Sequence, residues 1–139
     1  MKLLIPEQKK SLHTMQIPIR WGDMDAMGHV NNTLYFRYME IARLEWMAAS
    51  GVPANPQGEG PVIANAFCNF IRQLTYPGDV LIHTFCGAVG RSSFDTYHEL
   101  SLVGEPDTVY ANGGATVVWV DFPRKQSVPI PDRLRAVLN

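Results

Sequence analysis

Hydrophobic and polar residues alternate along several stretches of this chain. The first such stretch, residues 14–21 (TMQIPIRW), predicts a β-strand. Pro18 favours an edge position or a bulge, because proline cannot donate a backbone hydrogen bond to a neighbouring strand. Four later stretches are long and rich in β-forming residues: 62–74, 80–89, 93–103 and 108–121. Short turn sequences separate them, so we expect consecutive strands to pair in antiparallel.

Residues 33–50 predict one long helix. Its apolar positions are Leu34, Tyr35, Tyr38, Met39, Ile41, Ala42, Trp46, Ala48 and Ala49. The polar stripe between them is narrow and consists of Arg37, Glu40 and Arg43. Asn32 or Thr33 can cap the start of the helix, and Gly51 can end it. Because a helix that is apolar over most of its circumference must be surrounded, we expect burial on nearly all sides.

The order of these elements predicts an α+β fold with a single domain over residues 1–139. One helix cannot cover both faces of a five-stranded sheet. We therefore expect a curved antiparallel sheet wrapped around one long central helix, with an outer face that needs a partner. The tail 132–138 (DRLRAVL) predicts a short amphipathic helix.

The composition of the chain argues against several classes of function. The net charge is −1, which favours binding neither to nucleic acid nor to an anionic membrane. Only 18% of residues are charged, which favours burial of surface in an oligomer. Cys68 and Cys86 are expected to be free core thiols. The apolar run in MKLLIPEQKKS is too short for a signal peptide, and no stretch has membrane-spanning length, so we expect a cytoplasmic protein. The motifs predict neither a metal nor a cofactor site.

The segment before the long helix is dense in turn-forming residues. Gly22, Asp23, Asp25 and Gly28 lie there, just ahead of two asparagines. A helix start offers unpaired backbone N–H groups and the positive end of the helix dipole. A carboxylate beside such donors can act as a base or nucleophile next to an oxyanion site, which indicates acyl chemistry. The structural alternative is that Asp25 only closes its own turn.

The motif GDMDAMGHVNN before a long helix, followed by four antiparallel strands, resembles the hotdog-fold acyl-CoA thioesterases. The likeness is closest to the hydroxybenzoyl-CoA thioesterase-like branch and extends from about Met15 to the IPDRLRAVL tail. The resemblance implies a hotdog fold and an acyl-CoA substrate. It also implies a homodimer or homotetramer, in which strands pair across the dimer and each site takes residues from two chains.

The resemblance assigns roles to individual residues. It implies that Asp25 is the catalytic carboxylate, either general base or nucleophile, and that the backbone N–H at Asn32 polarises the thioester carbonyl. His29 could shuttle protons, although a loop or interface histidine explains it as well. Asn31 could line the pocket or serve only as a helix cap.

The same resemblance implies that the turn at Arg91, Ser92 and Ser93 meets the CoA phosphates, for which arginine is well suited. An ordinary charged hairpin is an equally good interpretation of this turn. Two other functions stay open: a non-catalytic acyl-CoA binding module, and a hydratase acting on an enoyl or hydroxyacyl thioester. Three residues separate Asp25 from His29 and no proline follows, which departs from the hydratase pattern.

Overall fold

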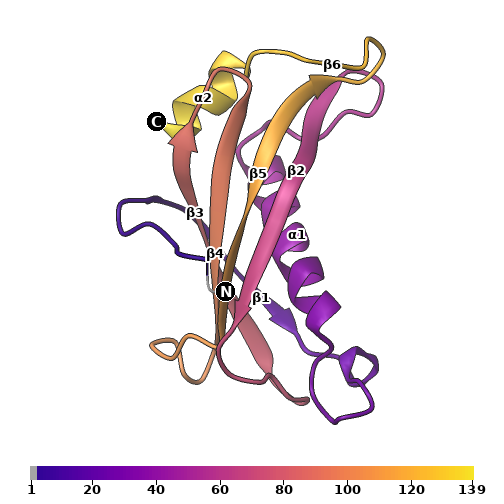
Figure 1. Cartoon of the computed structure of the whole chain (residues 1–139), viewed down its shortest axis with the longest axis vertical. Helices are drawn as coiled ribbons and strands as arrows, with labels where there is room; N and C mark the ends of the chain where they lie inside the picture. The colour runs from indigo at the N-terminus through magenta and orange to yellow at the C-terminus, as the bar shows by residue number, and fades with distance from the viewer. Residues whose placement is uncertain (1–2) are drawn as a thin grey trace.

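The computed structural model describes residues 3–139, where an antiparallel sheet packs against one long helix (Figure 1). In chain order the elements are β1 (Lys10–Pro18), the 3₁₀ turn η1 (Trp21–Asp23), α1 (Asn32–Ala49), β2 (Glu59–Phe70), β3 (Asp79–Val89), β4 (Ser93–Leu102), β5 (Ala111–Asp121), β6 (Gln126–Ser127) and α2 (Asp132–Leu138). The predicted α+β class is confirmed. The two-residue β6 is an addition to the five expected strands.

The strand order across the sheet is β1-β3-β4-β5-β2, and β6 pairs with β5. The prediction that consecutive strands pair is therefore wrong for β2 and β3. Their connection instead passes beneath the start of α1, where the Leu74 N–H donates to Tyr35 Oη (3.1 Å) and the Val30 N–H donates to the Leu74 carbonyl (2.9 Å). Leu74 is fully buried, so this connection is part of the core and carries the chain from one edge of the sheet to the other side.

The long helix buries one face only. Its buried residues are Tyr35, Tyr38, Met39, Ala42, Trp46 and Met47, which face the sheet. On the opposite face Phe36, Ile41 and Leu44 are exposed, with Leu44 at 48%. The expectation of burial on nearly all sides is thus wrong for a single chain, because the sheet covers α1 from one side.

The two edge strands of the sheet determine where another chain can pair with it. β1 is an edge strand that ends at Pro18, as its proline predicts, and its register changes between Ser11 and His13. β2 forms the opposite edge and pairs with β5. Val62 and Ile63 on β2 remain 44% and 40% exposed. An exposed apolar edge strand is a template for pairing with another chain.

The N-terminal segment lies across the outer face of the sheet (Figure 1). The backbone of Leu3 exchanges two hydrogen bonds with the side chain of Asn69 on β2. Lys9 Nζ lies 3.8 Å from Glu99 on β4 and 4.7 Å from the centre of the Phe85 ring. Residues 3–9 therefore cover part of the face that was expected to need a partner.

Cys68 and Cys86 are free thiols, as predicted, and they lie on strands that are not neighbours in the sheet. Cys86 is buried and Cys68 half-buried. Neither helix within residues 3–139 has the length and apolar content needed to cross a membrane.

Candidate active site

Asp25 closes the turn that precedes α1. Its Oδ1 accepts a hydrogen bond from the Met27 N–H (2.9 Å) and a longer one from the His29 N–H (3.5 Å). Its backbone N–H donates to the His29 carbonyl (2.8 Å), and Gly28 takes a φ of +79°, which glycine adopts without strain. Within residues 3–139 no hydrogen bond reaches Oδ2. One carboxylate oxygen is held by the turn, and the other is available.

Asp23 attaches this turn to the helix. Its Oδ2 accepts hydrogen bonds from the Arg20 N–H (2.9 Å) and the Tyr38 hydroxyl (2.8 Å), while its carbonyl accepts from the Asn31 N–H (2.9 Å). Burial of the Tyr38 phenol, and then its hydrogen bond to Asp23, raise the pKa of Tyr38 above its ordinary value. Tyr38 thus stays a donor at all physiological pH values, and Asp23 holds the turn.

Asn31 is the N-cap of α1, in place of Asn32 or Thr33. Its Oδ1 accepts from the Thr33 N–H (2.9 Å) and the Thr33 hydroxyl (2.7 Å). Asn32 is the first helical residue, and its backbone N–H has no hydrogen-bond partner within the described part of the chain. A free N–H at the positive end of the helix dipole is a suitable donor to an oxygen that gains negative charge.

A cavity of about 380 Å³ opens at this end of the helix. Its lining residues are Asp25, Met27, His29, Val30, Asn32, Tyr35, Phe70, Ile71, Arg72 and Gln73. The structure therefore brings Asp25, His29 and Asn32 together around one space. Asn31 does not line it, since its side chain is used as the cap.

The turn at residues 90–93 lies elsewhere in the same chain. The Arg91 carbonyl accepts from the Ile130 N–H (2.9 Å) and from the Arg135 side chain (3.0 Å), which attaches the turn to the C-terminal segment. The next strand packs Phe94 on Trp46, near the C-terminal end of α1 (ring centroids 6.0 Å apart). Trp46 follows Asn32 by fourteen residues, which corresponds to about 21 Å along the helix axis. The β3–β4 turn and the start of α1 lie at opposite ends of the molecule (Figure 1). Within one chain, Arg91, Ser92 and Ser93 do not approach Asp25.

Comparison with known proteins agrees with this architecture. Residues 19–138 match the model of the Thioesterase-like superfamily. The chain belongs to this superfamily. The PA2801 protein of Pseudomonas aeruginosa, provisionally assigned as a thioesterase, is 38% identical, with a TM-score of 0.90 over 94% of this chain and 100% of its own. A Xanthomonas campestris protein, provisionally assigned as an acyl-CoA thioesterase, is 36% identical, with a TM-score of 0.78 over 87% of this chain and 100% of its own.

A third similar structure is the gentisyl-coenzyme A thioesterase BH1999. It is 26% identical to this thioesterase-superfamily chain, with a TM-score of 0.82 over 91% of this chain and 100% of its own. The superfamily match and these neighbours together support thioester hydrolysis as the general activity. They agree with the resemblance that the motif before the long helix indicates.

Several lining residues of this superfamily member were not singled out from its sequence. Tyr35 lies on the buried face of α1, Phe70 is the last residue of β2, and Arg72 lies two residues beyond it. The apolar pattern marks Tyr35 and Phe70 only as core or strand residues. The path of the chain beneath α1 places them beside Asp25. It also places Arg72, a cation, among the residues that line the cavity. No local sequence signal reports that path.

Proposed function

We propose that this chain hydrolyses an acyl-CoA thioester to a free acid and CoA. The observation that carries the proposal is the shared cavity at the start of α1, which Asp25 and Asn32 both line. Within residues 3–139 the Asn32 N–H has no hydrogen-bond partner. The similar gentisyl-coenzyme A thioesterase and the Xanthomonas campestris protein support a CoA thioester as the substrate class.

In the general-base route, Asp25 acts on water. Water attacks the carbonyl carbon while Asp25 accepts one of its protons, and the Asn32 N–H together with the helix dipole stabilises the oxyanion. The C–S bond then breaks, and the leaving CoA thiolate takes the proton from Asp25. His29 lines the same cavity and could relay that proton.

In the nucleophilic route, Asp25 attacks the carbonyl itself and forms a mixed anhydride as the thiolate leaves. Water then hydrolyses the anhydride. Oδ2, which has no hydrogen bond within the described residues, suits either route, because Oδ1 is already engaged by the turn. A single turnover in oxygen-18 water separates the routes, since only the anhydride route can place label in the Asp25 carboxylate.

The proposed CoA contacts at Arg91, Ser92 and Ser93 require a second chain, because this turn lies at the far end of α1 from Asp25. We accordingly propose a homodimer, or a homotetramer built from it. The exposed apolar edge of β2 is the surface that supports pairing between chains.

The Asp25→Asn variant tests the proposal. Asparagine keeps the Oδ1 acceptor of the turn but removes the negative charge. We expect turnover of acyl-CoA thioesters, followed by release of free thiol, to fall by about 100- to 10,000-fold with folding preserved. A folded variant with near-wild-type turnover would refute the role of Asp25 and make His29 the next candidate. Wild-type protein that binds acyl-CoA but releases no thiol from any substrate would be a binding module.

A further inference from the structure

A partly buried arginine lies in the groove between α1 and β2, away from Asp25. Arg43 Nη1 lies 3.5 Å from Nε2 of His98, and burial lowers the pKa of the Arg43 guanidinium. Within residues 3–139 no carboxylate oxygen lies within 4.0 Å of Arg43. The charge of Glu40 acts against the effect of burial on the Arg43 pKa, but Glu40 is paired with Arg37 at 2.9 Å. A desolvated cation without an anionic partner is costly, so this arrangement calls for a ligand.

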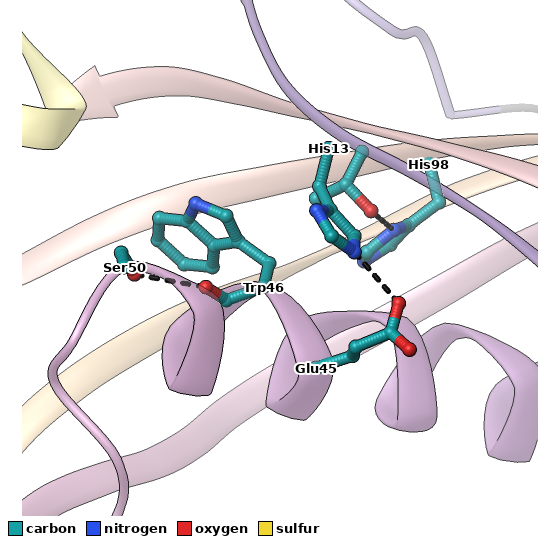
Figure 2. Close-up of polar contacts among 6 residues, drawn as sticks. His13, Glu45, Trp46, Ser50 and His98 are labelled. Carbon is teal, nitrogen blue, oxygen red and sulfur yellow. Dashed lines mark hydrogen bonds and ion pairs between the residues drawn. The ribbon is translucent and has the colours of Figure 1, made fainter.

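His98 holds Arg43 in position without neutralising its charge. His98 is fully buried, and its Nδ1 lies 3.0 Å from the Thr84 hydroxyl (Figure 2). Burial, and then the nearby Arg43, lower the pKa of His98 to about 3, so the ring is neutral. We assign the proton to Nδ1, which leaves Nε2 to accept from Arg43. The remaining guanidinium N–H groups are available to a ligand.

Two adjoining cavities share Arg43, Glu40 and Ile63. The first, about 300 Å³, extends from Thr33, the residue after Asn32, to Arg43. The second, about 120 Å³, continues past Arg43 between apolar side chains that include Trp46 and Phe94. Arg43 follows Asn32 by eleven residues, which corresponds to a rise of about 16 Å along the helix axis. Side chains on a helix lean toward its N-terminus, so the Arg43 guanidinium lies closer to Asn32 than this rise. The groove thus begins one residue beyond Asn32, which lines the separate cavity of the proposed active site, and it ends at a cation.

We propose that Arg43 binds a carboxylate at the far end of the acyl chain, so that the groove selects ω-carboxyacyl thioesters. The inference rests on the proposed thioesterase function. The planar guanidinium matches a carboxylate through two parallel hydrogen bonds. Phe36, Met39 and Ile63, which line the first cavity, suit the methylene chain between the two ends of such a substrate. The CoA phosphates, in contrast, are on the leaving-group side of the thioester.

The test compares matched thioesters that end in a methyl group or a carboxylate. Hexanoyl-, octanoyl-, decanoyl- and dodecanoyl-CoA are paired with adipoyl-, suberoyl-, sebacoyl- and dodecanedioyl-CoA. Wild type should prefer the carboxylate at one chain length. Arg43→Met keeps an apolar stem of similar length, and it should lower kcat/KM for that substrate by about 10- to 100-fold without lowering it for the methyl-ended partner. Arg124→Met, in the exposed turn before β6, is the charge-matched control and should retain the preference.

Other outcomes overturn the inference. An equal loss on both substrate classes would make Arg43 structural. A loss seen with CoA thioesters but absent with N-acetylcysteamine thioesters, which lack phosphates, would assign Arg43 to CoA. Dissociation of the variant in light scattering would assign it to contact with a second copy.

Binding separates this inference from the proposed function. Calorimetric titration of wild type with non-hydrolysable thioether analogues of suberoyl- and octanoyl-CoA, or of the preferred length, requires no variant and no turnover. Tighter binding of the carboxylate analogue in a protein without hydrolytic activity would support the subsite and refute the proposed function. Hydrolysis with no preference in binding or in kcat/KM would refute the subsite alone.

Discussion

At the scale of single residues, Asp25 combines a structural task with a proposed chemical one. Oδ1 accepts the Met27 N–H and closes the turn, whereas Oδ2 has no partner within residues 3–139. Both interpretations of this aspartate, turn former and catalytic carboxylate, are therefore compatible. The consequence for experiments is that asparagine tests the chemistry, while alanine would also remove the turn.

His98 gives a pH dependence of stability. Its pKa in the folded protein is about 3, below the ordinary histidine value near 6.5, because the ring is buried. The unfolded chain therefore binds a proton at this site that the folded chain does not. Stability is fully present above about pH 6.5 and should fall as the pH drops toward about 3, by about 1.4 kcal/mol per pH unit from this group. Urea unfolding at several pH values measures the slope.

The His98→Gln variant isolates this contribution from that of the carboxylates. Glutamine can still hydrogen-bond to Thr84 and Arg43 but does not titrate in this range. Its free energy of unfolding should depend less steeply on pH between about 4 and 6, by about one proton. Equal slopes for wild type and variant would show that His98 is accessible to protons in the folded state. His13 on β1, which pairs with Glu45 at 2.7 Å, is present in both proteins and therefore does not cause a difference between their slopes (Figure 2).

At the scale of elements, the start of α1 determines where the proposed oxyanion donor points. Asn31→Ala removes the acceptor for the Thr33 N–H and should cost about 1 kcal/mol of stability. The first turn should fray, which misplaces the Asn32 N–H and lowers kcat. Thermal unfolding and free-thiol release measure the two effects.

Asn31→Asp is the matched control for the cap. It keeps an oxygen acceptor and places negative charge at the positive end of the helix, so stability should be retained. If Asn31→Ala leaves both stability and kcat unchanged, the cap does not organise the site.

At the scale of the whole molecule, we expect β2 to mediate association. A dimer would have twice the mass of the 15.5 kDa chain in light scattering at micromolar concentration. Val62→Lys places a charge on the exposed edge and should shift the protein toward monomer. Val103→Lys alters an equally exposed valine in the loop after β4 (40% exposed, against 44% for Val62) and should leave the mass unchanged. A monomeric wild type would contradict the proposed assembly.

Arg91 tests whether two chains build one site. Its side chain is exposed and its carbonyl makes the contacts with the C-terminal segment, so Arg91→Ala should preserve the turn. We expect KM for CoA thioesters to rise while kcat changes little, because phosphate binding is common to the ground and transition states. N-acetylcysteamine thioesters should be hydrolysed as by wild type. An unchanged KM for CoA substrates would remove Arg91 from the site.

Much of the local structure was predictable from the sequence. The helix was expected at 33–50 and occurs at Asn32–Ala49, and the short C-terminal helix falls on the predicted DRLRAVL segment. The turn around Asp25 and the α+β pattern were also visible in the sequence. These features depend on hydrophobic periodicity and on turn and cap chemistry, which act between residues close in the chain.

The position of β2 was decided by tertiary structure. The short connection after β2 suggested a hairpin with β3, but burial of Leu74 beneath α1 sends the chain across to the other side. That crossing places Phe70 and Arg72 beside Asp25 and opens the groove that leads to Arg43. The contact between Arg43 and His98 joins residues 55 positions apart. Contacts at such separation depend on which buried surfaces pack together, and neither propensity nor spacing along the chain reports that choice.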